Sequence, residues 1–377
     1  MNYNHEQVRR KELRKQLDYI ERVKNDTSYY SALLSYMMLS APSRMFFEKC
    51  DEEKLFREYE SEVKEVSINL GMSEYSPKEK ILNFLEYIRM TVGYENVLVT
   101  TDEMHKMAGI SQSPVNAALL GKGVCASQAK FLEDLLLSSG FEEDEARSQV
   151  VWVRPEDEPL MRIAEHLVVL VHYEGEWHYF DPTAYNGSLE IFEYSFKICK
   201  VPDFIKLPKA SKEEIEVARE RVTQYLIRKL GIADISEDLK ISGLSDLEKQ
   251  IRFMIYLKKH LSPPPNKIKY RSVVFGTREV EVGKFLELLY FANDIPCEVI
   301  VNGNRNETTY YNIVIDGKKI ILFPGAMFDV VDGHDQISKS TSFVKDGTTR
   351  ALINLEELPE LKQLCMKYLA EAERVVK

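Results

Sequence analysis

The first part of the chain carries apolar residues at helical spacing. Up to about residue 65 they recur every three or four positions, as one face of an amphipathic helix requires, in two groups: Leu13, Leu17, Ile20 and Val23, and then Leu33, Leu34, Met37 and Met38. A further helix is expected from Pro77, because proline is tolerated in the first turn and apolar residues then recur as far as Val92. The pattern predicts a helical N-terminal segment over residues 1–70.

Between residues 121 and 183 the pattern changes from helix to strand. Gly121 and Gly123 interrupt it directly before Cys125, and a helical run of apolar residues follows the cysteine. Stretches rich in β-branched and aromatic residues, which are typical of strands, come next: QVVWV at 149–153, HLVVLVHY at 166–173 and EWHYF at 176–180. Glu174-Gly175 is a two-residue hairpin signal between the last two stretches. This order predicts a fold of the α+β class.

The second half of the chain resembles a degenerate copy of the first. Three pairs of segments match in the same order: EKILNFLEYI (79–88) with EKQIRFMIYL (248–257), KFLEDLL (130–136) with KFLELLY (284–290), and VHYEGEWHYFDP (171–182) with IVIDGKKIILFP (313–324). We interpret them as an internal duplication, although helix and hairpin pieces of unrelated α+β proteins also look alike. In this alignment Cys125, His166 and Asp181 fall opposite Glu279, Thr308 and Phe323.

The pattern divides the chain into five expected segments. They are a helical N-terminal segment (1–70), a main α+β domain (71–205), a helical linker (206–236), the degenerate repeat (237–335) and a C-terminal helical segment (336–377). The repeat has no residues equivalent to Cys125, His166 and Asp181. We therefore expect the function to lie in the main domain.

Composition and charge exclude several classes of partner. A net charge of −10 argues against binding nucleic acid, which needs clustered Lys and Arg. The sequence has no run of 18 apolar residues, so no membrane span is predicted. Its polar N-terminus does not resemble a signal peptide. The five cysteines show no metal-binding or disulfide spacing. We therefore expect a reducing, cytoplasmic setting and neither metal nor other cofactor; the oligomeric state stays open.

Cys125 is the first candidate for chemistry. It is expected at the start of a helix, where unsatisfied N–H groups and the positive end of the helix dipole favour a thiolate. Gly121 and Gly123 before it would let the backbone approach a substrate closely. The same context also fits a small buried apolar side chain, so the assignment needs a second group.

His166 and Asp181 supply that group if the hairpin register holds. A two-residue turn at Glu174-Gly175 pairs the residues on either side of it, which sets Val168 opposite Asp181. His166 and Asp181 then share a face as diagonal neighbours, and the carboxylate can orient the imidazole and stabilise its charged form.

The same register also tests whether another histidine could be the base. His178 points to the other face of the sheet, and His172 lies roughly 20 Å nearer the turn, six residues at about 3.3 Å each. His105 lies in an irregular stretch where geometry does not exclude it.

The short sequence motifs around these residues resemble those of a known family. GKGVCASQA, followed by EHLVVLVHYEGEWHYFDPT, is similar to the core of the transglutaminase-like superfamily, and the likeness covers roughly residues 76 to 200. It implies a papain-like core, with the cysteine helix packed on an antiparallel sheet. It also implies that Cys125 is the nucleophile, His166 the base and Asp181 the group that orients the histidine.

The resemblance leaves the oxyanion hole incomplete. The backbone N–H of Cys125 is expected as one donor. Many members carry an aromatic residue where this chain has Val168, and the aromatic donor usual in the family is not identified upstream. Tyr94, Gln112 and Asn116 remain candidates for the second donor.

The expected reaction is acyl transfer through a thioester on the cysteine. We favour hydrolysis of an amide in a peptide or protein substrate. Transfer of the acyl group to an amine is the alternative, although no calcium-loop pattern such as DxDxDG supports it. A non-catalytic binding or scaffold protein with a retired site is the third reading.

Overall fold

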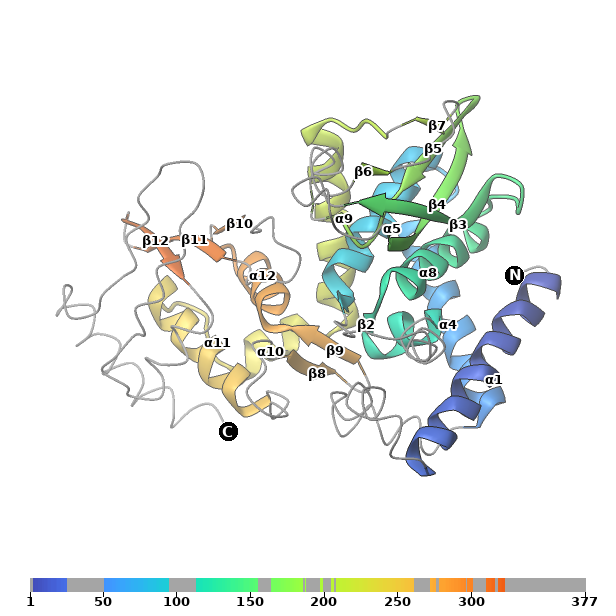
Figure 1. Cartoon of the computed structure of the whole chain (residues 1–377). Coiled ribbons are helices and arrows are strands. Elements are labelled where there is room, and N and C mark those ends of the chain that lie inside the picture. Colours follow the sequence, from blue (N-terminus) through green and yellow to red (C-terminus); the bar gives the residue numbers. More distant parts are fainter. Residues whose placement is uncertain are drawn as a thin grey trace. The chain divides into compact units, whose positions relative to one another are not determined.

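A computed structural model describes most of the chain between residues 3 and 322. The described residues are 3–25, 51–94, 113–154, 164–185, 187, 197–198, 205–206, 208–260, 272–275, 278–295, 297–300, 310–315 and 318–322. Contacts divide the chain into two compact units: residues 1–225 with 264–267 and 274–280, and residues 226–263 with 268–273 and 281–377. Figure 1 labels most of the elements of each. Mixed helix and sheet confirm the predicted α+β class.

The first unit contains most of the helices that the sequence predicts. They are α1 (Tyr3–Asn25), α4 (Glu52–Leu70), α5 (Pro77–Thr91), the π-helix η2 (Asn116–Leu120), α8 (Cys125–Ser138) and the larger part of α9 (Lys212–Lys229). α5 begins in a capping box, in which the Ser76 hydroxyl accepts from the Glu79 N–H and the Glu79 carboxylate accepts from the Ser76 N–H. The predicted apolar group Leu33, Leu34, Met37 and Met38 lies outside the described residues.

A five-stranded sheet follows α8. Its strands are β3 (Ala146–Arg154), β4 (Ala164–Tyr173), β5 (Glu176–Phe180), β6 (Lys197–Ile198) and β7 (Ile205–Lys206), in the order β6-β3-β4-β5-β7. All neighbours are antiparallel except β5 and β7, which run parallel. A separate parallel pair, β1 (Gly93–Tyr94) and β2 (Lys122–Gly123), precedes α8.

The β4–β5 hairpin has the predicted register. Tyr173 pairs with Glu176, and both turn residues are left-handed, with φ of 53° at Glu174 and 80° at Gly175. Two positive φ values are what a type I′ turn requires, and its twist matches that of the strands. The register extends along both strands as far as Val169 and Phe180, which brings Asp181 to the level of Val168.

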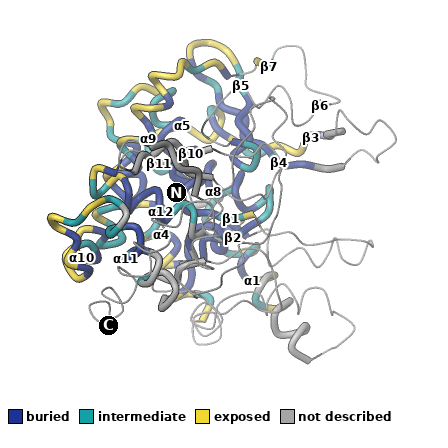
Figure 2. Tube along the Cα trace, turned by 90° about the vertical axis from the view of Figure 1, so that its left-hand side faces the viewer, coloured by how far each residue is buried: buried dark blue, intermediate teal, exposed yellow. Residues whose placement is uncertain are grey.

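α8 is the centre of the first unit. It packs on β3 and β4 and also contacts α4 and α5. The Ser148 hydroxyl of β3 donates to the Glu133 carboxylate of α8 at 2.7 Å, which ties the sheet to this helix. Buried residues concentrate along α4, α5 and α8 (Figure 2). Each large apolar side chain buried here stabilises the fold by roughly 1.5–3 kcal/mol.

The second unit repeats part of this order. It contains α10 (Ile232–Asp238), α11 (Asp246–His260), α12 (Val282–Ala292) and an antiparallel sheet of β10 (Cys297–Ile300), β11 (Tyr310–Ile315) and β12 (Lys318–Leu322). A further pair, β8 (Ser272–Phe275) and β9 (Arg278–Glu281), comes before α12. The expected linker, residues 206–236, contains α9 and much of α10.

The two hairpins are built alike. Ile315 pairs with Lys318 across two residues, as Tyr173 pairs with Glu176, and in both units one helix precedes three antiparallel strands. The duplication stays an interpretation of the sequence. Glu279, opposite Cys125 in the alignment, lies in β9 rather than at a helix start. Thr308, Phe323 and the expected C-terminal helical segment lie outside the described residues.

Crossing a bilayer needs a long apolar helix. Within the described part of the chain, no helix has both the length and the apolar character for it.

Candidate active site

Cys125 is the first residue of α8. The chain reaches it through Gly121, which ends η2 in the left-handed region with φ of 70°, and through Gly123, where an added Cβ would lie only 1.9 Å from the Ser127 Oγ. Both positions therefore need glycine. The N-cap residue Val124 offers no side-chain cap, so the positive end of the helix acts on the Cys125 sulfur. The thiol is partly exposed.

His166 and Asp181 form a buried pair. Nε2 of His166 lies 2.6 Å from Oδ2 of Asp181, and the two residues are 8% and 5% exposed. The second carboxylate oxygen, Oδ1, accepts from the backbone N–H groups of Thr183 at 3.0 Å and Ala184 at 3.2 Å. The carboxylate is therefore fixed on both sides, by the imidazole and by its own turn.

The imidazole also contacts the sulfur. Burial raises the pKa of Cys125, but the hydrogen bond to His166 and the charge of that ring outweigh burial, and the pKa is lowered. The Leu167 N–H favours the thiolate as well. Because Asp181 takes Nε2, the other nitrogen of the ring, Nδ1, is left to exchange a proton with the sulfur.

The pKa of His166 moves in the opposite direction. Burial lowers it, but the charge of Asp181 and hydrogen bonds to Asp181 and Cys125 raise it to about 10. A lowered thiol pKa beside a raised imidazole pKa favours a thiolate–imidazolium pair. Such a pair is a ready nucleophile with a proton donor next to it.

His172 and His178 of the same sheet lie away from this pair. The His178 ring stacks on Tyr173 at 4.2 Å between centroids, and His178 pairs with Val171, on the other face from Asp181. The His172 ring lies 5.3 Å from that of Trp177, near the turn. His105 lies outside the described residues.

The candidates for the second oxyanion donor are separated by the fold. Tyr94 pairs with Gly123 across β1 and β2, close to the start of α8, and is 40% exposed. Asn116 is 2% exposed within η2, and its carbonyl accepts from the Gly121 N–H. Gln112 lies outside the described residues. Position and exposure favour Tyr94 over Asn116.

Sequence reasoning missed two backbone contributions. The Leu167 N–H at the sulfur had no sequence signal, because any residue after the histidine provides one. The two N–H groups at Asp181 did have one: Asp-Pro-Thr is typical of a turn in which the aspartate accepts from the backbone just beyond it. The order of residues could thus have predicted the fixed carboxylate.

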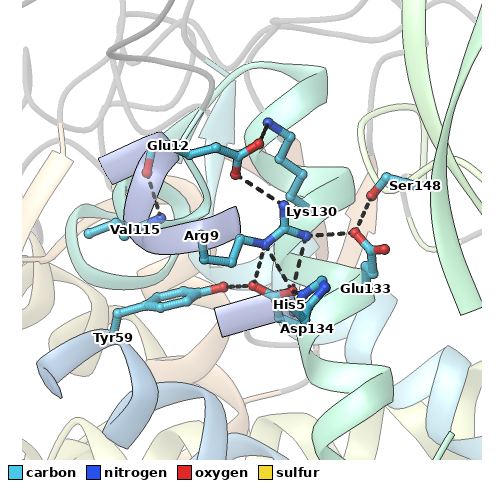
Figure 3. A network of polar contacts seen from close by, with 10 residues as sticks. His5, Arg9, Glu12, Tyr59, Val115, Lys130, Glu133, Asp134 and Ser148 are labelled. Atoms are coloured by element: carbon cyan, nitrogen blue, oxygen red, sulfur yellow. Dashed lines mark hydrogen bonds and ion pairs between the residues drawn. The ribbon is translucent and has the colours of Figure 1, made fainter. Parts of the chain in front are cut away.

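Among the residues that the structure describes, one group of side chains has ligand spacing for a metal ion. Ligand atoms of His5, Glu133 and Asp134 lie within 4.8 Å of one another. Figure 3 shows the Arg9 guanidinium among them, with Nε 3.0 Å from Asp134 and NH2 2.6 Å from Glu133. A metal ion would have to displace this buried cation, so the group does not fit a metal.

Comparison with known proteins adds no relative. No family model, curated protein or solved structure matches the chain. The resemblance to the transglutaminase-like superfamily stays a prediction from short sequence motifs. Functional inference depends on the geometry of the three side chains.

Proposed function

We propose that the chain is a cysteine-dependent acyl-transfer enzyme that hydrolyses an amide bond in a peptide or protein. The observation that carries the proposal is one connected set of contacts: sulfur to imidazole to carboxylate, at the start of a helix. A buried structural cysteine needs neither a histidine partner nor an aspartate behind it. The lowered pKa of Cys125 and the raised pKa of His166 are what a nucleophile and its acid require.

The first step forms the thioester. The Cys125 thiolate attacks the amide carbonyl, and the backbone N–H of Cys125, with Tyr94 as the candidate second donor, stabilises the oxyanion. The C–N bond then breaks, and the His166 imidazolium gives its proton to the leaving amine. Asp181 holds the His166 ring in place in both its charged and its neutral state.

The second step releases the acyl group. Water attacks the thioester while neutral His166 accepts its proton, and the C–S bond breaks to leave a carboxylic acid and the thiolate. The proton count balances, because His166 ends the cycle charged, as it began. An amine in place of water would give transamidation by the same route.

We propose the transglutaminase-like, papain-type core as the fold behind this chemistry. A helix that carries the cysteine and an antiparallel sheet that carries the histidine support it. On this reading the second unit is a degenerate copy that has lost the reactive groups. A reducing cytoplasm would keep the thiol free.

The test is the pH profile of alkylation at Cys125. Iodoacetamide reacts with the thiolate, so we expect fast reaction at about pH 6, where an ordinary thiol with a pKa of about 8.5 is almost fully protonated. Modified peptides are assigned by mass spectrometry, which separates Cys125 from the other four cysteines. The profile should move to higher pH in His166→Ala.

Product analysis then identifies the reaction. A peptide library incubated with the protein should yield new carboxylates, and hydroxylamine should trap the thioester as a hydroxamate. Cys125→Ser should yield neither product. Amine incorporation in place of carboxylates would identify transamidation. An ordinary thiol profile with no product would leave the non-catalytic reading.

A further inference from the structure

The peptide bond between Val124 and Cys125 carries a group on which the proposed reaction depends. A trans peptide is planar, with its C=O and N–H groups pointing in opposite directions. The direction of the Val124 carbonyl therefore sets the direction of the Cys125 N–H, the first donor of the proposed oxyanion hole. This N–H points out of the start of α8, where no carbonyl of the helix can accept it.

Two donors from the first turn of α8 hold the Val124 carbonyl. The Gln128 N–H donates to it at 3.1 Å, as the first hydrogen bond of the helix, and the Ser127 hydroxyl donates to it at 2.9 Å. Ser127 is fully buried, and the Val124 side chain offers no hydrogen bond to the helix start. Of the two donors, the hydroxyl is the one that a change of side chain can remove.

The peptide before it is held from the same turn. The Nε2 of Gln128 donates to the Gly123 carbonyl at 3.4 Å, and Gln128 is 3% exposed. Gly123 also pairs with Tyr94 across β1 and β2, so this contact links the first turn of α8 to the candidate second donor. The Ser127 Oγ fills the space beside Gly123, since an added Cβ would lie 1.9 Å from it. Ser127 and Gln128 together fix the two peptides that lead into Cys125.

We infer that Ser127 and Gln128 are positioning residues of the oxyanion hole: they fix the peptides that aim the Cys125 N–H at the oxygen that becomes negatively charged. The inference rests on the proposed function. Without the Ser127 hydroxyl, the Val124 carbonyl keeps the backbone donor but its peptide gains freedom to tilt. A tilted N–H stabilises the oxyanion less, whereas the thiolate keeps its place beside His166.

Two reagents separate these effects at the same sulfur. Iodoacetamide alkylates the Cys125 thiolate by displacement of iodide at a saturated carbon, so no oxyanion forms. With p-nitrophenyl acetate the thiolate attacks the ester carbonyl and an oxyanion forms; the C–O bond then breaks, which releases p-nitrophenolate and leaves an acetyl thioester. Absorbance measures the release, and the part due to Cys125 is the difference from Cys125→Ala. The ratio of the two rates reports oxyanion stabilisation apart from thiolate reactivity.

The test variant is Ser127→Ala, which removes one hydroxyl and introduces a good helix former. We expect acylation by p-nitrophenyl acetate to slow about tenfold, while alkylation by iodoacetamide stays within about twofold of the wild-type rate. The matched control is Ser139→Ala. The Ser139 hydroxyl donates to the Leu136 carbonyl at 2.8 Å, also three residues back but at the other end of α8, so both rates should stay at their wild-type values.

A second variant covers the case that Ser127→Ala does not fold. Gln128→Met keeps an unbranched side chain of similar length and removes the amide that holds the Gly123 carbonyl. Acylation should again slow while alkylation does not. The effect should be smaller than in Ser127→Ala, because 3.4 Å is long for a hydrogen bond.

The outcomes separate the two proposals. A wild-type protein that releases p-nitrophenolate no faster than Cys125→Ala contradicts the proposed function itself. A wild-type ratio of the two rates in folded Ser127→Ala, or in Gln128→Met if only that variant folds, overturns the positioning role alone. Equal slowing of both reactions overturns it too, because it indicates that the sulfur and the imidazole have moved apart. So does a changed ratio in Ser139→Ala.

Discussion

Arg9 of α1 and Asp134 of the helix that begins with Cys125 form a buried ion pair. Nε of Arg9 lies 3.0 Å from Oδ2 of Asp134, and the side chains are 4% and 0% exposed. Tyr59 and His5 also hydrogen-bond this carboxylate, and Glu133 and Glu12 take other nitrogens of the guanidinium (Figure 3). The pair joins the N-terminal helix to the helix that begins with the candidate nucleophile Cys125.

Asp134→Asn should therefore destabilise the protein strongly. Removing one partner leaves a buried guanidinium without its main counter-charge, which costs about 3–5 kcal/mol. Denaturant unfolding at constant pH measures the loss. The matched control is Glu53→Gln, whose partner Arg10 also lies on α1 but where Glu53 is 57% exposed; its effect should be small, since solvent screens such pairs. Equal losses in the two variants would contradict the argument.

The sequence could predict what short-range rules determine. The two-residue turn at Glu174-Gly175 fixes which residues pair. Counting residues from this turn therefore predicted that His166 and Asp181 lie close together. Glycines before Cys125 indicated the helix start in the same way. These features depend on local backbone geometry, and nearby residues encode it.

Long-range partners could not be predicted. Arg9 meets Asp134 across 125 positions, and periodicity indicates that each helix has an apolar face but not which helices meet. The ion pair of Arg219 with Glu86 has the same origin. Strands β6 and β7 have two residues each, too few for a period to show. Tertiary packing decides all of these.

Gly123→Ala should disturb the start of α8. The new Cβ would lie 1.9 Å from the Ser127 Oγ and 3.0 Å from its Cβ, so the serine or the first turn of α8 has to move. Overpacking of this kind costs about 1–3 kcal/mol, and alkylation of Cys125 at low pH should slow because the sulfur shifts from His166.

A double variant tests whether the clash with Ser127 is the cause. Gly123→Ala with Ser127→Ala removes the closer contact and leaves the 3.0 Å one, so stability and alkylation should recover in part. Ser127→Ala alone, which loses the hydrogen bond to the Val124 carbonyl at 2.9 Å, is the reference. A double variant no better than Gly123→Ala would show that the clash is not the cause.

The buried pair of His166 and Asp181 should make stability depend on pH. The folded pKa of His166 is raised from 6.5 to about 10, so its contribution is fully present below about pH 6.5 and is lost as the pH rises toward 10. Cys125→Ala removes the opposing titration of the thiol and its share in raising the His166 pKa, and leaves the larger share, which comes from Asp181. In that background, the stability difference between His166 and His166→Gln should shrink from about pH 6.5 upward. A difference independent of pH would contradict the raised pKa.

Glu174 offers a way to stabilise the hairpin that carries the histidine. Its φ of 53° costs a residue with a Cβ free energy that asparagine or glycine largely avoids. Glu174→Asn should therefore raise the free energy of unfolding by about 0.5–1 kcal/mol, and Glu174→Val should lower it, because β-branched residues tolerate this region least. Thermal unfolding of the two variants measures both effects. Since the side chain is exposed, neither change should alter the pH profile of Cys125 alkylation, and a destabilised Glu174→Asn would show that the turn does not control the stability of β4 and β5.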